Sequence, residues 1–556
     1  MAFEIENGIL KKYIEEDGIT EILIPDGITE IKNEAFRKCS NLKSIIIPNS
    51  VTKIGSYAFS GCSNLKNIKM PNKIEIIECG VFFECSSLKN IEIPNSVIKI
   101  ENCAFECSNL KSIIIPTSVS EIEHYAFSGC SNLKSIKIPN KITTIKCGTF
   151  HQCSNLENIE IPSSVTTIEN LAFYECFGLK SIKIPNGVIE IYPEAFCRCF
   201  HLESVSISDS VIKLSKDAFI GCNQLKSISV EKGNPNFYDK DGILFSNDSL
   251  VCYPRGRKED TYTVPNGIKK IKKDAFNECH NIINVNIPSS VNEIEDGAFF
   301  NCSKLESVSV EKGNPYVYDI DGILFQDNCL IYYPSRRKEK MYTIPIGITE
   351  IRHYAFWCCS SLETITIPKS IVKIEENTFF HCKNLKKVMI SKNTTEIDRT
   401  AFDGCDNLES FSVEEGNPQY WSKDGVLFQD KCLIFFPYKK AGTYVIPDNI
   451  TEIQFGAFGA CLNLTNVKIP SSVVKIGESA FACSGLVRMV IPDSIREIEP
   501  GTFFDCENLK SVIVPKSVVK IGESAFERCI NLTDLVIEND DVEIESFAFE
   551  ECGYIK

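Results

Sequence analysis

A unit of 23 residues recurs along almost the whole chain, and it constrains the fold more than any other feature. One copy occupies residues 130–153 and follows the skeleton C-x-x-L-x-x-I-x-I-P-x-x-V-x-x-I-x-x-x-A-F-x-x. A repeat of this length indicates a solenoid, in which each copy forms one coil and packs only on its two neighbours. The whole chain of 556 residues can therefore fold without one large compact core.

The apolar pattern inside one copy predicts strands and turns. Leu133, Ile136 and Ile138 show strand periodicity, and Pro139 ends that segment. Ile142 and Ile145 begin a return segment in which a second short strand fits. The Ala-Phe-x-x-Cys piece is too short for a stable helix, so we expect a single helical or 3-10 turn there. We predict a β-rich repeat solenoid whose successive strands form a long parallel sheet.

Three copies and one terminus depart from the regular unit. Asn7-Gly8 lies between two apolar stretches, so residues 1–18 are predicted to form a β-hairpin that caps the first coil. Residues 19–556 are predicted to form a single solenoid. Lengthened coils are expected at about 231–264, 311–344 and 414–446, because each contains a Gly-Asn-Pro and then an Asp-Gly turn signal between apolar runs.

The overall charge and hydropathy bear on the kind of partner. The formal net charge is -15, which argues against nucleic acid or an anionic membrane as the main partner. No apolar run approaches the roughly 20 residues of a transmembrane span. The amino terminus carries acidic residues where a signal peptide has basic ones. We therefore expect that the protein stays inside the cell, or has lost a leader, or is exported by another route.

Cysteine is unusually frequent, with 27 residues in the chain. The repeat places 19 of them at one position, which we interpret as a buried, reduced, small apolar site. Disulfides between successive coils would distort the stack, and the closest pairs lack the two-residue gap of a zinc knuckle. We predict no metal site and no other cofactor. The 19 residues are Cys39, Cys62, Cys85, Cys107, Cys130, Cys153, Cys176, Cys199, Cys222, Cys279, Cys302, Cys359, Cys382, Cys405, Cys461, Cys483, Cys506, Cys529 and Cys552.

No pattern in the sequence predicts catalysis. The six histidines are scattered over different coils, and no pair has the spacing of a metal site or a general base. The chain has no glycine-rich phosphate loop and no Gly-x-Ser-x-Gly motif. We predict no catalytic residues and no enzymatic activity.

Two surfaces are candidates for partner binding. The first is an apolar stripe of Val490, Ile513 and Val536, which equivalent repeat positions place on adjacent strands near the carboxyl-terminal end. Arg488 and the equivalent residues of the next two coils give it a polar rim. The alternative interpretation is chance exposure.

The second candidate surface is a set of basic residues that follow each hairpin of the lengthened coils. On an acidic protein they could form one positive edge for an acidic protein or an anionic glycan. The alternative is that they are solvated turn residues. The set consists of Arg255, Arg257 and Lys258, of Arg336, Arg337 and Lys338, and of Lys439 and Lys440.

The repeat resembles the BspA-like class of leucine-rich repeats, as residues 134–153 and 203–222 illustrate. The resemblance implies a right-handed leucine-rich solenoid without catalytic residues. It also implies a surface protein that adheres to protein partners, among them host matrix or cell-surface proteins. The alternative is an intracellular leucine-rich-repeat scaffold, which the many unpaired cysteines favour. The oligomeric state is left open.

Overall fold

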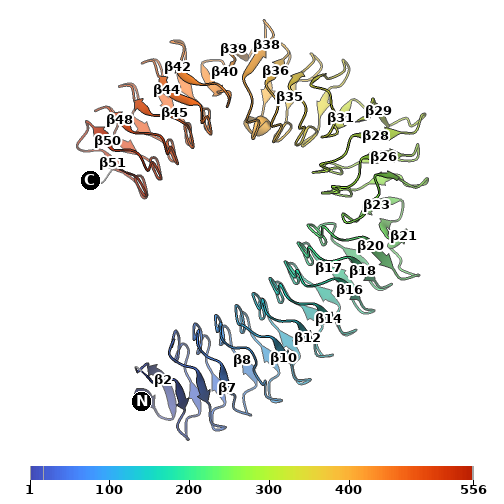
Figure 1. Ribbon diagram of the computed structural model, residues 1–556, viewed down its shortest axis with the longest axis vertical. Helices are drawn as coiled ribbons and strands as arrows, with labels where there is room; N and C mark the ends of the chain where they lie inside the picture. Colours follow the sequence, from blue (N-terminus) through green and yellow to red (C-terminus); the bar gives the residue numbers. More distant parts are fainter. Residues whose placement is uncertain (1, 17, 554–556) are drawn as a thin grey trace. The chain divides into compact units, whose positions relative to one another are not determined.

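The computed structural model describes residues 2–16 and 18–553 of the chain. It contains two compact units. One takes in the chain up to Ile282 together with Ser290–Cys302, and the other takes in Ile283–Ser289 together with the chain from Ser303 onward. Each unit is a stack of similar coils whose strands lie side by side (Figure 1). The repeat-solenoid class predicted from the sequence is thus confirmed, whereas the single domain over residues 19–556 stays a prediction.

Most coils contribute one longer strand of three to five residues, formed by the Leu-x-x-Ile-x-Ile segment. The longer strands are β3 (Glu21–Leu23), β5 (Ser44–Ile46), β7 (Asn67–Lys69), β10 (Ser112–Ile114), β12 (Ser135–Lys137), β14 (Asn158–Glu160), β16 (Ser181–Ile184), β18 (Ser204–Ile207), β20 (Ser227–Val230), β24 (Thr261–Thr263), β26 (Asn284–Ile287), β28 (Ser307–Val310), β32 (Met341–Thr343), β34 (Thr364–Thr366), β36 (Lys387–Ile390), β38 (Ser410–Val413), β42 (Gly442–Val445), β44 (Leu464–Lys468), β46 (Arg488–Val490), β48 (Ser511–Val514) and β50 (Asp534–Ile537).

The return segment of each coil forms a second strand of only two residues, as its apolar spacing allows. These short strands are β4 (Glu30–Ile31), β6 (Lys53–Ile54), β8 (Ile76–Ile77), β9 (Lys99–Ile100), β11 (Glu121–Ile122), β13 (Thr144–Ile145), β15 (Thr167–Ile168), β17 (Glu190–Ile191), β19 (Lys213–Leu214), β25 (Lys270–Ile271), β27 (Glu293–Ile294), β33 (Glu350–Ile351), β35 (Lys373–Ile374), β37 (Glu396–Ile397), β43 (Glu452–Ile453), β45 (Lys475–Ile476), β47 (Glu497–Ile498), β49 (Lys520–Ile521) and β51 (Glu543–Ile544). Both kinds of strand pair in parallel with the equivalent strand of the next coil.

The expected long sheet of the longer strands is divided into sheets of two to four strands. Lengthened coils separate β20 from β24, β28 from β32 and β38 from β42. Two further coils are one residue short, with Phe105-Glu106-Cys107 and Phe481-Ala482-Cys483 where two residues normally stand between phenylalanine and cysteine. They coincide with the breaks between β7 and β10 and between β44 and β46. The break between β14 and β16 coincides with neither, and nothing in the structure explains it.

The Ala-Phe segment forms the third side of each coil. Except at Ala401-Phe402, where it is 3-10 helical, it is a turn rather than the expected helical or 3-10 turn. Tyr57 and Gly61, which flank Phe59 at two residues on either side, both have positive φ, at 56° and 71°. Left-handed residues at such close spacing prevent a helix. The backbone instead bonds to the next coil, as where the Phe36 N–H donates to the Ala58 carbonyl at 2.8 Å. The one 3-10 helix among the described residues is η1 (Arg399–Phe402).

In most regular coils the phenylalanine is buried and stacks on the phenylalanine of the next coil, and in the first two lengthened coils Tyr253 and Tyr333 take its place. Between Phe105 and Phe127, for example, the ring centroids are 5.4 Å apart with an interplanar angle of 1°. Every ring adds a large apolar area to the core, and the offset stack adds a specific orientation. The resulting aromatic column is the most regular feature of the interior of each unit.

The cysteine that lies three residues after the phenylalanine also donates a hydrogen bond. The Cys62 thiol donates to the carbonyl of Phe36 in the preceding coil at 3.0 Å, and the Cys176 thiol donates to the carbonyl of Phe150 at 3.1 Å. The thiol therefore fills space and also adds a second hydrogen bond to a buried carbonyl that already accepts a backbone N–H, from Cys39 or Cys153. All 27 cysteines lie in the described residues and are free thiols.

Two cysteines were assigned to this position wrongly. In the two coils that are one residue short, the buried residue three places after phenylalanine is Ser108 or Ser484. Cys107 and Cys483 lie one place earlier, where both have a φ of 55°. The missing residue therefore lies between the cysteine position and the next core leucine. It does not lie between phenylalanine and the cysteine position, because inter-coil hydrogen bonds fix the length of the turn that contains phenylalanine. This leaves 17 cysteines at the position.

The amino-terminal strands β1 (Ala2–Glu6) and β2 (Ile9–Ile14) pair antiparallel. Asn7 and Gly8 connect them with φ values of 51° and 73°, which is the backbone of a two-residue type I′ turn. β2 also pairs in parallel with β4, and Tyr13 stacks on Phe36 at 5.3 Å. The hairpin therefore covers the first coil and begins the aromatic column.

Each lengthened coil contains a three-stranded antiparallel meander rather than a single hairpin. The strands are β21 (Phe237–Lys240), β22 (Ile243–Ser246) and β23 (Ser249–Cys252), then β29 (Val317–Ile320), β30 (Ile323–Gln326) and β31 (Cys329–Tyr332), and then β39 (Tyr420–Lys423), β40 (Val426–Gln429) and β41 (Cys432–Phe435). The third strand of each meander takes the place of a short strand and pairs in parallel with β25, β33 or β43. Each insertion is thus built into the solenoid.

Candidate interaction surfaces

The apolar stripe has the geometry that the repeat predicts. β46, β48 and β50 pair in parallel, and the register places Val490 beside Ile513 and Ile513 beside Val536. Their exposed fractions are 56%, 37% and 45%, so all three side chains lie on the outer face of the sheet. Because paired strands are about 4.8 Å apart, the three form one continuous apolar row.

A polar row runs beside the apolar stripe. Arg488 lies opposite Ser511, which lies opposite Asp534. The Ser511 hydroxyl donates to the Asp534 carboxylate at 2.9 Å. The rim therefore has both charge signs and is partly ordered by an inter-strand hydrogen bond. The role of the stripe and its rim in binding stays a prediction.

Arg255 is turned into the protein, with a side chain that is only 9% exposed. It donates from Nη1 to the Phe219 carbonyl at 2.6 Å and from Nε to the Asn277 carbonyl at 2.7 Å. In a regular coil the Phe219 carbonyl would accept a hydrogen bond from the thiol of the cysteine in the next coil. The next coil after Phe219 is the first lengthened coil, and it has Gly256 at the cysteine position. The guanidinium thus replaces the missing thiol as the donor to this carbonyl.

Arg257 and Arg337 fold back on their own meanders. The Arg257 guanidinium lies 5.6 Å from the ring centroid of Tyr253 and donates to the Asp241 carbonyl at 2.6 Å. Arg337 makes the same two contacts in the second lengthened coil. In the third, Lys440 donates from Nζ to the Asp424 carbonyl at 2.6 Å. These three side chains brace the Asp-Gly turn of each meander.

The remaining members of the basic set, Lys258, Arg336, Lys338 and Lys439, are exposed. Arg336 also donates from Nε to the Ser303 carbonyl at 3.0 Å. The first lengthened coil lies in one unit and the other two lie in the second unit. The continuous positive edge therefore stays a prediction. Five of its eight members also donate to backbone carbonyls of the chain: Arg255, Arg257, Arg336, Arg337 and Lys440.

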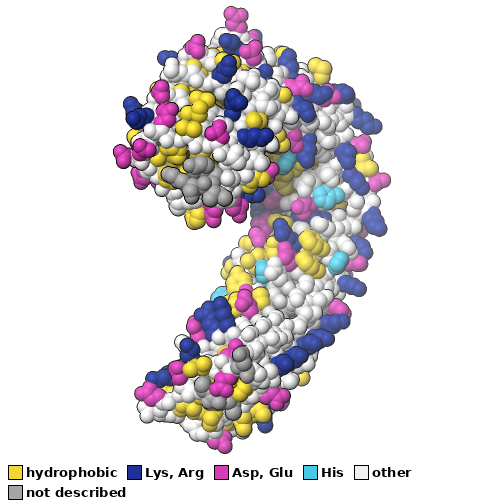
Figure 2. All heavy atoms as spheres, turned by 60° about the vertical axis from the view of Figure 1, so that its left-hand side comes forward, with side chains coloured by type: hydrophobic (Ala, Val, Ile, Leu, Met, Phe, Trp, Pro, Cys, Tyr) yellow, Lys and Arg dark blue, Asp and Glu magenta, His cyan; other side chains and the backbone are white. Residues whose placement is uncertain are grey.

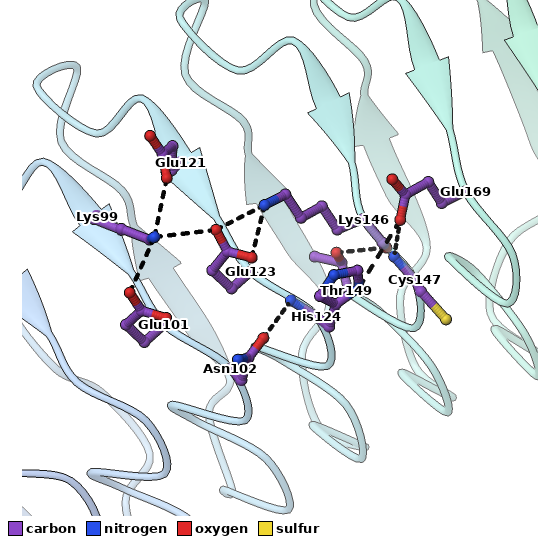
Figure 3. Close-up of polar contacts among 10 residues, drawn as sticks. All are labelled: Lys99, Glu101, Asn102, Glu121, Glu123, His124, Lys146, Cys147, Thr149 and Glu169. Carbon is purple, nitrogen blue, oxygen red and sulfur yellow. Dashed lines mark hydrogen bonds and ion pairs between the residues drawn. The ribbon is translucent and has the colours of Figure 1, made fainter.

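A network of charged side chains lies on the outer face of the short strands and was not found in the sequence (Figure 3). Lys99 lies 3.0 Å from Glu101, 3.1 Å from Glu121 and 3.3 Å from Glu123. Lys146, from the following coil, contacts Glu123 at 2.6 Å. Three coils thus share one alternating cluster of positive and negative charge.

The cluster shifts the pKa values of its members in the directions expected for ion pairs. The hydrogen bonds that Lys99 donates to Glu101 and Glu121 raise the pKa of Lys99 above its ordinary value. Burial raises the pKa of Glu123, but its contacts with Lys146 and Lys99 outweigh burial and hold the pKa below the usual value. Both groups are charged at neutral pH, which suits a structural ladder and not proton transfer.

The same arrangement recurs along both units. Oppositely charged residues at the first position of adjacent short strands form inter-coil pairs, each contributing about 0.2–1 kcal/mol. The sequence signal was the alternation of Lys and Glu just before the last isoleucine of each coil. The pairs and their distances are Lys53 and Glu30 (3.8 Å), Lys213 and Glu190 (3.6 Å), Lys270 and Glu293 (2.6 Å), Lys373 and Glu396 (3.7 Å), Lys475 and Glu452 (3.3 Å), and Lys520 and Glu497 (3.5 Å).

The histidines lie apart from any cluster of ligands. His124 lies 3.8 Å from Glu169 at a half-exposed position, and its backbone N–H donates to Asn102 (Figure 3). Over residues 2–16 and 18–553, no group of three or more His, Cys, Asp or Glu side chains could hold a metal ion. Within the same described ranges, no helix has the length and apolar character that crossing a membrane requires.

Comparison with solved structures found bacterial leucine-rich repeat proteins. A leucine-rich cell surface protein from Faecalibacterium prausnitzii is 26% identical, with 73% of this chain and 90% of that chain covered and a TM-score of 0.40. A leucine-rich repeat protein from Eubacterium ventriosum is 19% identical over 68% and 83% of the two chains, with a TM-score of 0.42. One from Bacteroides ovatus is 19% identical over 100% and 97%, with a TM-score of 0.35. No curated protein sequence matched the chain.

A family model gives the more direct assignment. The model described as the BspA type leucine-rich repeat region matches residues 8–134, 120–250, 257–333, 335–422 and 434–556. These segments cover nearly all of the sequence, and the gaps between them, at residues 251–256, 334 and 423–433, fall in the lengthened coils. The chain therefore belongs to the BspA-type leucine-rich repeat family.

Proposed function

We propose that the protein is a non-enzymatic binding protein of the BspA-like surface type that adheres to protein partners, such as host matrix or cell-surface proteins. The observation that supports this proposal is the exposed apolar row of Val490, Ile513 and Val536 with its polar rim. An apolar centre inside a polar rim is the usual anatomy of a protein interface. Three adjacent aliphatic side chains on a solvent-facing sheet also serve no purpose in the core.

The test replaces Val490, Ile513 and Val536 with serine together and measures adherence of the full chain to a surface coated with extracellular-matrix proteins. We expect adherence to fall at least about tenfold, because each aliphatic side chain contributes on the order of 1 kcal/mol when buried at an interface. The matched control replaces the outward residues Thr343, Thr366 and Lys468 with serine.

Both variants are expected to keep the circular dichroism spectrum of the wild type, because none of the substituted side chains enters the core. Unchanged adherence of the stripe variant would count against the stripe. Light scattering on the same samples then shows whether the stripe mediates association between copies of the chain.

The second candidate function is an intracellular leucine-rich-repeat scaffold. The observation that favours it is the set of 27 free thiols, because reduced cysteines persist in the cytosol and are oxidised more readily outside the cell. Fractionation of the source cell with thiol counting on the native protein separates the two candidates. A protein recovered from the cell surface contradicts the scaffold.

A further inference from the structure

A row of five lysines crosses five consecutive coils of the first unit. Lys43, Lys66, Lys89, Lys111 and Lys134 occupy the same repeat position, directly after the core leucine, and all five are exposed. Their backbones bond to one another between coils: the Lys66 N–H donates to the Lys43 carbonyl at 2.9 Å, and the Lys111 N–H donates to the Lys89 carbonyl at 2.9 Å. Successive lysines are thus one strand spacing apart, about 4.8 Å.

Four of these lysines have no acidic partner. Among the described residues, no carboxylate lies within ion-pair distance of Lys43, Lys66, Lys89 or Lys111. Farther along the same column the charges alternate, and Lys226 lies 2.7 Å from Glu203. Like charges in register repel one another, so the unbroken row weakens the stack and the packing of the coils does not explain it. The chain therefore concentrates positive charge here despite its net charge of -15.

A groove runs beside the row on the outer face of the longer strands. Its cavity of about 630 Å³ has a lining that includes Ser44, Asn67, Asn90 and Ser112, each of which directly follows one of the four unpaired lysines. One positive and one negative side chain, Lys69 and Glu92, also line it, so the excess of positive charge comes from the lysine row beside the groove. Ile46 and Ile114 form an exposed apolar part of the same groove. In Figure 2, Lys and Arg side chains follow one another along the lower part of the molecule, where the amino-terminal coils lie.

We propose that this groove and its lysine row bind an anionic polysaccharide, lying along the coils with its sulfate or carboxylate groups toward the lysines. The charges are complementary, and both the polysaccharide and the solenoid repeat their groups along one direction. The serine and asparagine side chains offer a hydrogen-bonding group to sugar hydroxyls at each coil, and the isoleucines offer apolar surface to the ring C–H groups. The site goes beyond the proposed function, which rests on residues of the second unit.

An acidic segment of a protein is the competing occupant, and the repeat argues against it. The four unpaired lysines and the four polar side chains that directly follow them repeat at every coil along the groove. Protein interfaces instead gain most of their affinity from a few large side chains in fitted pockets. The periodic surface fits a chain of similar sugar units better.

The experiment measures binding of dextran sulfate to the full chain by calorimetry, with uncharged dextran and poly-glutamate as comparisons. We expect dextran sulfate to bind, dextran not to bind, and affinity to fall with increasing salt as counterions are displaced. Replacing Lys43, Lys66, Lys89 and Lys111 with glutamine is expected to weaken binding by about tenfold or more. Dextran sulfate is also expected to protect these lysines from acetylation.

The matched control replaces Lys180, Lys226, Lys386 and Lys510 with glutamine, which removes the same charge from the same column on other coils. We expect it to bind dextran sulfate within about twofold of the wild type. Equal losses in both variants would mean that only net charge matters, and this result overturns the proposal. Tighter binding of poly-glutamate than of dextran sulfate overturns it in favour of an acidic protein. The stripe variant, Val490, Ile513 and Val536 to serine, is expected to bind normally, so this test and that of the proposed function fail independently.

Discussion

At the scale of single residues, the cysteine position shows how a small side chain can combine two tasks. Cys176 is fully buried between coils, and its thiol reaches the carbonyl of Phe150 at 3.1 Å. Burial raises the pKa of this thiol well above its ordinary value, so it remains a neutral donor. Alanine would fill part of the space but remove the thiol, so that the Phe150 carbonyl would keep only the hydrogen bond from the Cys153 N–H at 3.2 Å.

We therefore predict that Cys176→Ala lowers the free energy of unfolding by about 1–2 kcal/mol, as measured by urea denaturation. Cys107→Ala is the matched control, because Cys107 is exposed and lies one residue before the buried position. Its effect is expected to stay within about 0.5 kcal/mol. Equal effects of the two substitutions would contradict the assignment of Ser108, rather than Cys107, to the buried position.

The sequence could not place that residue correctly, for a specific reason. Cys107-Ser108-Asn109-Leu110 matches the Cys-Ser-Asn-Leu of a regular repeat, so alignment by sequence places Cys107 with the other repeat cysteines. The backbone decides otherwise, since the Ser108 N–H donates to the Phe105 carbonyl as the regular cysteine does. A one-residue deletion can be absorbed in either of two turns, and only the inter-coil hydrogen bonds show which one.

At the scale of elements, the turn signals of the lengthened coils predicted one hairpin of each meander and missed the other. Asp241-Gly242 predicted the first hairpin, and both residues have positive φ, at 53° and 77°. The second hairpin of the meander was missed because its turn, at Asn247-Asp248, contains no glycine. Asn247 nevertheless has a φ of 51°, a conformation that asparagine tolerates better than most residues. The inward turn of Arg257 was hidden too, since a basic residue after a hairpin usually faces solvent.

We predict that Arg257→Ala loosens the first meander without unfolding the neighbouring coils. The substitution removes the hydrogen bond to the Asp241 carbonyl and the stacking on Tyr253, which together contribute on the order of 1–3 kcal/mol. Hydrogen exchange followed by mass spectrometry should become faster in residues 237–252 and stay unchanged in β16 and β18.

Two variants sharpen this test. Arg257→Lys is expected to keep most of the protection, because Lys440 makes the equivalent bond in the third lengthened coil at 2.6 Å. Lys258→Ala, at the exposed neighbouring position, is expected to change nothing. Faster exchange in Lys258→Ala, or none in Arg257→Ala, would show that the arginine does not brace the turn.

At the scale of the whole molecule, the same raised thiol pKa recurs at the cysteine position of many coils. Burial raises the pKa of Cys85, Cys130, Cys222 and Cys302 to about 12, from an ordinary value of 9.0. In the unfolded chain these thiols lose their protons near the ordinary value, while in the folded chain they keep them. Their contribution to stability is thus complete below about pH 9 and is lost as the pH rises toward 12.

We predict a steep loss of thermal stability as the pH rises from about 9 to 10, in the presence of reductant. Each thiol can lower the free energy of unfolding by up to about 1.4 kcal/mol per pH unit, and several such thiols in each unit add together. Tyr253 and Tyr333, whose pKa values burial also raises to about 12, ionise in the unfolded chain only near pH 10, so the onset belongs to the cysteines. Melting followed by circular dichroism at several pH values measures the slope.

The variant that isolates the cause replaces Cys130, Cys153, Cys176 and Cys199 with serine, a residue that Ser108 and Ser484 show to fit the same position. Serine does not ionise in this range, so the variant is expected to be less stable at neutral pH and yet to lose less stability above about pH 9. An unchanged slope would assign the alkaline loss to tyrosines or to repulsion among the carboxylates of this acidic chain. A shallower slope would show that the cysteine ladder, formed coil by coil from one repeated residue, sets the alkaline limit of the fold.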